Sequence, residues 1–281
     1  MDADVAGLSQ FTITEPTPGY WHVLFSNPPL NLLNSTSVVQ IAELVKAIEA
    51  AADLKVVVFA SEHPDFFMAR YDLSDRSPVA FAATDNGVTL FIDSMLRMSN
   101  ASPITIASIR GRTRGGGSEF ALSCDLRFAS IENALLGQPE VGVGMLPAGG
   151  AIERLPSLVG SARALEIIAS SDDYDALTAE KYGWINRAVP DQDLDAFVGR
   201  FARRLASFDA AALGAAKRLI RHQTTAASLA QYRDTLATVR ELLGSPDFSG
   251  RRQAIAQRAQ EVGTDFELRM GHHLDHSRYA S

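Results

Sequence analysis

A run of three glycines, Gly115 to Gly117, stands between a segment typical of a buried strand and a segment typical of a helix. The apolar, β-branched stretch from Pro103 to Ile109 predicts the strand, and Glu119 to Cys124 predicts the first turns of the helix. Consecutive glycines allow backbone conformations that are closed to other residues and leave main-chain amides exposed. The first amides of a helix lack an internal partner and lie at the positive end of its dipole. The junction therefore predicts a binding site for an oxygen that carries or develops negative charge.

The segments before this junction alternate between strand-like and helix-like patterns. Two short strand patterns flank a Pro-Thr-Pro-Gly turn and predict a β-hairpin over 11–25. Apolar residues at helical spacing over 35–51 predict a helix, 55–60 is typical of a buried strand, and 87–99 predicts a further helix. This alternation favours an α/β domain with a largely covered sheet.

The second half of the chain is mostly helical. A strand pattern at 126–130 and a second glycine-rich connection at 137–150 come first. Helical patterns follow at 163–170, 193–207, 209–222, 227–243 and 249–262, interrupted by a turn capped by Thr178 and a short strand at 185–189. We therefore divide the chain into a core at 1–190 that carries the candidate site, a helical region at 191–262, and a divergent polar tail at 263–281.

The overall charge argues against nucleic-acid and membrane-surface partners. The 281 residues carry a formal net charge of −7, and no stretch approaches the ~20 apolar residues that span a bilayer. The single cysteine, Cys124, excludes an intramolecular disulfide and a multi-cysteine metal site, which fits a reducing compartment. The N-terminal residues resemble neither a signal peptide nor a transit peptide, so we expect a cytoplasmic protein.

Five ordered motifs carry a resemblance to a known family. They are Asn27-Pro-Pro-Leu-Asn31, Phe67-Met-Ala-Arg-Tyr-Asp72, Gly115-Gly-Gly-Ser-Glu119 with Cys124-Asp125, Gly137-Gln-Pro-Glu140 followed by Pro147-Ala-Gly-Gly150 and Arg154-Leu155, and the segment from Thr178 to Pro190. Over roughly residues 10 to 260 the chain resembles the enoyl-CoA hydratase/isomerase (crotonase) superfamily. A lone glycine triplet is a weak signal, whereas ordered matches at the right separations are specific.

The resemblance implies a crotonase-like spiral of ββα turns with a C-terminal helical region, assembled as a homotrimer or a dimer of trimers. It implies an acyl-coenzyme A substrate and no separate cofactor, because coenzyme A is part of the substrate. The implied activity is that of a lyase in fatty acid metabolism, which adds water reversibly to a 2-enoyl-CoA.

The resemblance also assigns catalytic roles by position. The main-chain amides of Tyr71 and Gly116 would form an oxyanion hole that holds the thioester oxygen and stabilises an enolate-like intermediate. Glu119 would orient and activate water, and Glu140 would protonate or deprotonate C2. Two carboxylates that share one water can do both, because their proximity raises the proton affinity of one of them. Without the motif, a capping role for Glu119 and a solvated loop position for Glu140 would be the simpler interpretation.

A further group of residues is expected to bind substrate, and no metal ligand is expected. The substrate-binding residues implied by position are Pro29, Leu30, Ala69, Arg70, Gly115, Pro139 and Ala148. The main chain around Pro29, Leu30 and Ala69 would meet the adenine and pantetheine groups of coenzyme A.

The chain departs from the family pattern at two places. Arg70 and Tyr71 stand where two small residues are usual. We favour a solvated Arg70 over a contact with a coenzyme A phosphate, and the Tyr71 ring either packs away or narrows the acyl pocket. Arg110, Arg112 and Arg114 are basic where the family is usually apolar or small. They contact a carboxylate or phosphate, or they form salt bridges between subunits.

Other functions remain as alternatives. A double-bond isomerase or a hydrolase could use the same scaffold, because an oxyanion hole serves any thioester enolate. A catalytically inactive binding protein of the crotonase fold is the alternative from a different class. Cys124 is expected to be a small buried residue rather than a nucleophile. The tail also contains four potential metal ligands without a scaffold, from which we expect no metal site: His272, His273, Asp275 and His276.

Overall fold

The computed structural model describes residues 7–75, 77–79, 82–223 and 227–275. Its first element is the predicted hairpin, in which β1 (Phe11–Thr17) pairs antiparallel with β2 (Tyr20–Phe25). The turn between the strands needs glycine. Gly19 has a φ of +79°, and a Cβ there would lie 2.9 Å from the carbonyl oxygen of Asp53.

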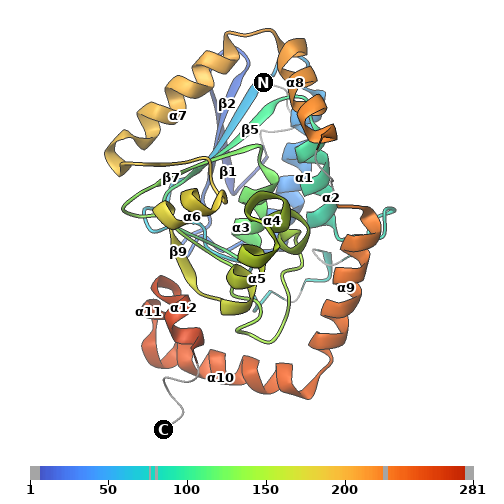
Figure 1. The fold of residues 1–281 in the computed structure, drawn as a ribbon, viewed down its shortest axis with the longest axis vertical. Helices are drawn as coiled ribbons and strands as arrows, with labels where there is room; N and C mark the ends of the chain where they lie inside the picture. The colour runs from blue at the N-terminus through green and yellow to red at the C-terminus, as the bar shows by residue number, and fades with distance from the viewer. Residues whose placement is uncertain (1–6, 76, 80–81, 224–226, 276–281) are drawn as a thin grey trace.

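Two sheets form the centre of the fold (Figure 1). The first has six strands in the order β1-β2-β3-β5-β7-β10 and is parallel from β2 onward. The second has four short strands in the order β4-β6-β8-β9, with only its β8–β9 pair antiparallel. The remaining strands of the first sheet are β3 (Val56–Ser61), β5 (Ile104–Ile109), β7 (Leu126–Ser130) and β10 (Arg187–Val189). Those of the second are β4 (Phe66–Met68), β6 (Arg112–Arg114), β8 (Leu135–Gly137) and β9 (Asp173–Asp175).

After the hairpin and α1, three successive turns of the chain each add one strand to each sheet and then a helix. β3, β4 and α2 (Leu90–Asn100) form one unit, β5, β6 and α3 (Gly116–Ser123) the next, and β7, β8 and α4 (Ala151–Val159) the third. This arrangement is the predicted spiral of ββα turns. The other helices up to residue 262 are α1 (Ser35–Ala50), α5 (Ser161–Ser170), α6 (Ala176–Tyr182), α7 (Asp191–Ala206), α8 (Ala210–His222), α9 (Leu229–Leu243) and α10 (Pro246–Val262).

The first sheet is covered on both faces, and alternate side chains of β3 enter different parts of the core. Val57 and Phe59 pack in the cluster that includes the apolar face of α1, whereas Val56 and Val58 pack in the cluster that includes α7. The continuous apolar run in β3 is therefore explained by helices on two sides. This rigid support carries the loops that follow β3 and β5.

Several short elements escaped the sequence patterns. Strands β6, β8 and β9 have three residues each, which is too short to show an alternation of apolar and polar residues. Helix α4 was also missed, and it contains Pro156, a residue that weakens a helical pattern. The turn attributed to a Thr178 cap is α6. Its cap is Asp175, whose side chain accepts the N–H of Thr178 at 2.7 Å.

Helix α7 packs on the first sheet and α9 packs against α4, whereas α10 buries no residue and leads the chain back to β9 (Figure 1). The last two helices are α11 (Thr264–Leu268) and α12 (Met270–Leu274), which lie near β9. The segment from 263 onward was expected to be a polar tail, but these helices bury Phe266, Met270 and Leu274. Five-residue helices are too short to show a periodic pattern. Residues 276–281 lie outside the described part of the chain.

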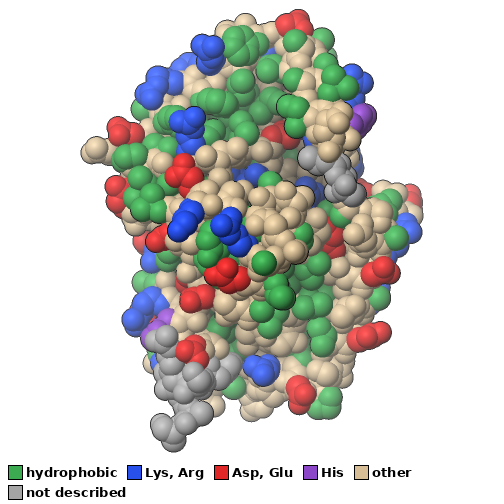
Figure 2. Space-filling view, viewed as in Figure 1, with side chains coloured by type: hydrophobic (Ala, Val, Ile, Leu, Met, Phe, Trp, Pro, Cys, Tyr) green, Lys and Arg blue, Asp and Glu red, His purple; other side chains and the backbone are tan. Residues whose placement is uncertain are grey.

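Figure 2 shows acidic and basic side chains interspersed over one face rather than gathered into a patch of one sign. Among the described residues, no helix combines the length and the apolar character needed to cross a membrane.

Candidate active site

Two of the three glycines allow close approaches that any side chain would block. Gly115 precedes α3 with a φ of +47°, and a Cβ there would lie 2.5 Å from Oε1 of Glu140. A Cβ on Gly117 would overlap the carbonyl oxygen of Met68 in β4. The start of α3 can therefore lie directly against both a carboxyl group and a neighbouring strand.

Gly116 is the first residue of α3 and lies beside the backbone of Tyr71. A Cβ on Gly116 would lie 3.7 Å from the nitrogen of Tyr71 and 3.4 Å from the side chain of Leu33. Leu33 fixes the loop: its N–H donates to the carbonyl of Arg70, and its carbonyl accepts the N–H of Asp72, both at 2.8 Å. The two residues expected to supply oxyanion-hole amides thus lie side by side, one of them at a helix N-terminus.

The Tyr71 ring turns toward the start of α1. Its hydroxyl donates to Oδ2 of Asp75 at 3.2 Å and lies 3.4 Å from the hydroxyl of Ser35. Burial raises the pKa of Tyr71 to about 12, so the phenol stays neutral at physiological pH. The ring also packs against the main core cluster. The Tyr71 ring therefore packs away, which was the first of the two alternatives considered for it.

Glu119 is buried in α3, and the second glycine-rich connection holds its carboxyl group. Oε1 accepts N–H bonds from Gly149 at 2.6 Å and from Ala151 at 3.2 Å. A Cβ on Gly149 would overlap Oε2 of Glu119 and the ring of Phe91. Burial raises the pKa of Glu119 to about 7, although these N–H donors oppose the shift. A carboxyl group that titrates near neutrality can act as either an acid or a base.

Glu140 follows β8 and presents its carboxyl group to the start of α3. Its Oε2 is buried and has no hydrogen-bond partner among the described residues. Burial raises the pKa of Glu140 well above its ordinary value, and the negative charge of Glu119 raises it further. Neither glutamate fits the simpler interpretation. Glu119 accepts from another loop instead of capping α3, and Glu140 is not a solvated loop residue.

A third carboxyl group, Glu153 of α4, was not singled out from the sequence. Its Oε1 accepts the Thr235 hydroxyl of α9 at 2.6 Å, and its Oε2 is buried without a partner among the described residues. The negative charge of Glu153 raises the pKa of Glu119. The available sequence signal was its position directly before the Arg154-Leu155 motif.

The loop expected to meet coenzyme A is fixed by Asn31. This residue is 1% exposed, has a φ of +54°, and donates from Nδ2 to the carbonyl of Phe67 at 2.8 Å. Its own carbonyl accepts the N–H of Ala69 at 3.0 Å. Pro29 is exposed and Leu30 is half-buried at the outer end of the same loop. The expected coenzyme A contacts therefore belong to one connected part of the structure.

The other expected substrate-binding residues lie near the two glutamates. Pro139 is buried, and its Cδ lies 3.8 Å from the position of a Cβ on Gly115. Ala148 directly precedes the glycine that holds Glu119 and packs against a small cluster that includes Ile92 and Tyr232.

The Arg70 side chain is not solvated, so that prediction was wrong. Its guanidinium pairs with the carboxylate of Glu267 in α11, with Nε at 3.1 Å from Oε2, and Nη1 donates to the carbonyl of Tyr71 at 2.9 Å. A carboxylate of the same chain thus neutralises the charge that was considered for a coenzyme A phosphate.

The basic residues before the glycine triplet likewise bind carboxylates of their own chain: Arg110 binds Asp191 and Asp195, Arg112 binds Asp65, and Arg114 binds Asp173.

The remaining candidates take structural positions. Cys124 is buried, and burial raises the pKa of its thiol to about 12, which agrees with the prediction of a buried residue rather than a nucleophile. His273 is buried and pairs with Asp265 at 2.8 Å. His276 lies outside the described residues.

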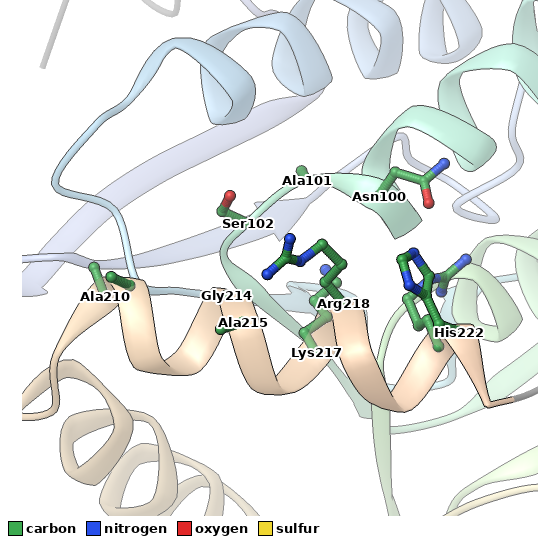
Figure 3. A pocket seen from close by; sticks show the side chains of 11 residues that line it. Asn100, Ala101, Ser102, Ala210, Gly214, Ala215, Lys217, Arg218 and His222 are labelled. Carbon is green, nitrogen blue, oxygen red and sulfur yellow. The ribbon is translucent and has the colours of Figure 1, made fainter.

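A separate hollow of about 350 Å³ lies between the end of α2 and α8 (Figure 3). Lys217 lines it, but its ammonium group binds Asp125 at 2.7 Å and the carbonyl of Pro103 at 2.8 Å. The described lining residues include neither the glutamates nor the residues beside Gly116. We assign this hollow to the packing of α8 on the first sheet.

Comparison with known proteins shows the family of this chain. The family model for enoyl-CoA hydratase/isomerase matches residues 19–249. The chain belongs to the enoyl-CoA hydratase/isomerase family. A candidate enoyl-CoA hydratase of Rhizobium meliloti is 32% identical over 216 residues, which cover 76% of this chain and 82% of that protein. The crotonyl-CoA hydratase of Syntrophomonas wolfei is 32% identical over 193 residues, which cover 66% of this chain and 72% of that protein.

A solved structure confirms the fold of this family member. The crystal structure of a candidate enoyl-CoA hydratase from Streptomyces avermitilis is 36% identical and superimposes with a TM-score of 0.89. The match covers 96% of this chain and 98% of the other. The family resemblance and the crotonase-like α/β fold with a C-terminal helical region, both predicted from sequence, are therefore correct.

Proposed function

We propose that this protein catalyses the reversible addition of water to a 2-enoyl-CoA thioester. The observation that carries the proposal is a pair of buried glutamates beside the start of α3: Oε1 of Glu140 lies against Gly115, and the carboxyl group of Glu119 is held by the N–H groups of Gly149 and Ala151. Burial and the charge of Glu119 raise the pKa of Glu140 well above its ordinary value, which favours the protonated form of this group. The pKa of Glu119 lies near 7, so a large share of this group is ionised. One acid and one base are thereby available under the same conditions.

In the proposed mechanism, the amides of Tyr71 and Gly116 hold the thioester oxygen. Negative charge grows on that oxygen when water adds to C3, and preorganised N–H donors stabilise the transition state more than the ground state. Glu119 takes a proton from the attacking water, and Glu140 gives its proton to C2 of the enolate. The reverse sequence removes water from a 3-hydroxyacyl-CoA.

The two glutamates favour hydration over double-bond isomerisation, which moves a single proton along the chain and can use one carboxyl group. The named hydratases among the relatives support the same choice. Coenzyme A enters as part of the substrate, and the proposed chemistry uses no separate cofactor.

A cytoplasmic location and a homotrimer or dimer of trimers complete the proposal. Helix α10 supports an assembly, because none of its 17 residues is buried within the chain. Light scattering of the purified protein tests the oligomeric state.

The first experiment is hydration of crotonyl-CoA, followed by loss of the enoyl absorbance, with butyryl-CoA binding measured in parallel. Turnover supports the hydratase. Butyryl-CoA binding without turnover contradicts hydration of a short enoyl-CoA and favours a sibling reaction. The absence of both binding and turnover would contradict the acyl-CoA proposal and favour an inactive binding protein.

A further inference from the structure

Helix α11 is held by two arginines, Arg70 in the loop after β4 and Arg114 at the end of β6. Glu267 in α11 is 7% exposed, and its carboxylate binds both Nε and Nη2 of Arg70. Its carbonyl oxygen accepts Nη1 of Arg114 at 2.6 Å. Arg114 is 1% exposed and also makes a bidentate pair with Asp173 of β9, at 2.6 and 2.8 Å. Glu267 is therefore connected to the loop after β4 and to the end of β6 through charge-assisted bonds.

The positions of the two arginines give these bonds a consequence for the site. Arg70 directly precedes Tyr71, and its guanidinium also donates to the Tyr71 carbonyl at 2.9 Å. Arg114 lies two residues before Gly116, and its backbone N–H donates to the carbonyl of Ala69 at 3.2 Å. The same residue of α11 thus reaches both chain segments that present the proposed oxyanion-hole amides.

We infer that Glu267 is a positioning residue that fixes the distance and direction between the amides of Tyr71 and Gly116. This inference rests on the proposed oxyanion hole. Two amides stabilise one oxygen only if both donors point at it, and a misplacement of about 1 Å can cost about 100-fold in rate. Glycine-rich backbone is deformable, so an anchor outside the loop contributes to this preorganisation. Through Glu267, α11 contributes to the chemistry by holding these two chain segments.

The test is Glu267→Ala, with two separate readouts. The first is steady-state hydration of crotonyl-CoA. The second is the absorption spectrum of a bound aryl-conjugated enoyl-CoA, whose band moves to longer wavelength when its carbonyl is polarised. We expect kcat to fall by about 10- to 100-fold with KM changed by less than about threefold, because the loss concerns the transition state. The red shift of the bound chromophore should shrink in parallel.

Arg269→Ala is the matched control, because it removes an exposed ion pair with Asp265 in the same segment. It should leave kcat and the red shift unchanged. If Glu267→Ala fails to fold, Glu267→Gln keeps the side-chain shape without the charge, and Arg70→Lys keeps the charge without the bidentate geometry, so both variants provide the same comparison. A double variant of Arg70 and Glu267 should lose no more activity than the Arg70 single variant, because removal of Arg70 already breaks its bonds to both Glu267 and the Tyr71 carbonyl.

An unchanged kcat and red shift in folded Glu267→Ala would overturn the inference while leaving hydration intact. An equal loss in Arg269→Ala would also overturn it, because the effect would then belong to helix docking in general. If the wild-type protein polarises the chromophore but does not hydrate crotonyl-CoA, hydration fails as the function. The red-shift comparison still decides the role of Glu267.

Discussion

Gly115 and Glu140 approach so closely that a Cβ at position 115 would lie 2.5 Å from Oε1 of the glutamate. The reciprocal relationship exists on the other side of the site, where Glu119 rests against Gly149. Each glutamate therefore contacts a glycine from the other glycine-rich segment. The two glycine-rich segments depend on each other. Each supplies one carboxyl group and also the glycine that leaves room for the carboxyl group of the other segment.

Glu140→Gln is expected to retain the fold and lose about 10²- to 10⁴-fold in kcat, because the amide cannot give or take the proton at C2. The measurement is crotonyl-CoA hydration together with a thermal melt. Glu180→Gln, an exposed change in α6, is the control and should be silent. An active Glu140→Gln enzyme would contradict the proposed role.

Two substitutions at Gly116 distinguish the role of its amide from the role of the space beside it. Proline is tolerated at the first position of a helix but removes the N–H, so Gly116→Pro should reduce kcat by about 10²- to 10³-fold. Gly116→Ala keeps the amide, and its Cβ would lie 3.4 Å from Leu33 in ordinary contact. This variant should stay within a few-fold of wild type. If both variants fold and have equal activities, the assignment of the Gly116 amide to the oxyanion hole is contradicted.

The parts of the site that sequence could predict are those encoded locally. The glycine triplet, Glu119 and Glu140 stand in short motifs, and the family resemblance that those motifs carry, not their spacing, predicted that the two glutamates meet. Strands of five or more residues such as β3 and β7 were recognised from their apolar runs. Local encoding is sufficient there because the residues that form each element also determine its pattern.

The parts that sequence could not predict depend on partners far along the chain. Arg70 meets Glu267 across a separation of 197 residues, and no local pattern indicates that pairing. Without it, a solvated arginine is the reasonable expectation. Glu153 was missed for the same reason, because its partner Thr235 belongs to a distant helix.

The raised pKa of Glu119 also predicts how stability changes with pH. Its folded-state pKa is about 7 against an ordinary value of 4.5. The folded state therefore keeps a proton that the unfolded state releases. The contribution of Glu119 to the free energy of unfolding is fully present below pH 4.5. It is lost as pH rises to about 7, and this loss amounts to about 3 kcal/mol. Glu119→Gln should remove most of this loss. Urea unfolding at several pH values should therefore show that the free energy of unfolding of the variant rises relative to that of wild type above pH 5. A difference that is constant with pH would contradict this linkage.

The pH profile of hydration tests the same group in the active enzyme. Glu119 must be ionised to accept a proton from water, so kcat/KM should rise with pH through an apparent pKa near 7. This apparent value belongs to the coupled pair of Glu119 and Glu140, because the charge of each group affects the other. The charge of Glu153 raises the pKa of Glu119, so Glu153→Gln should move the acidic limb to lower pH. Glu180→Gln should leave the acidic limb in place, whereas an acidic limb that Glu153→Gln does not move would exclude Glu119 as its source.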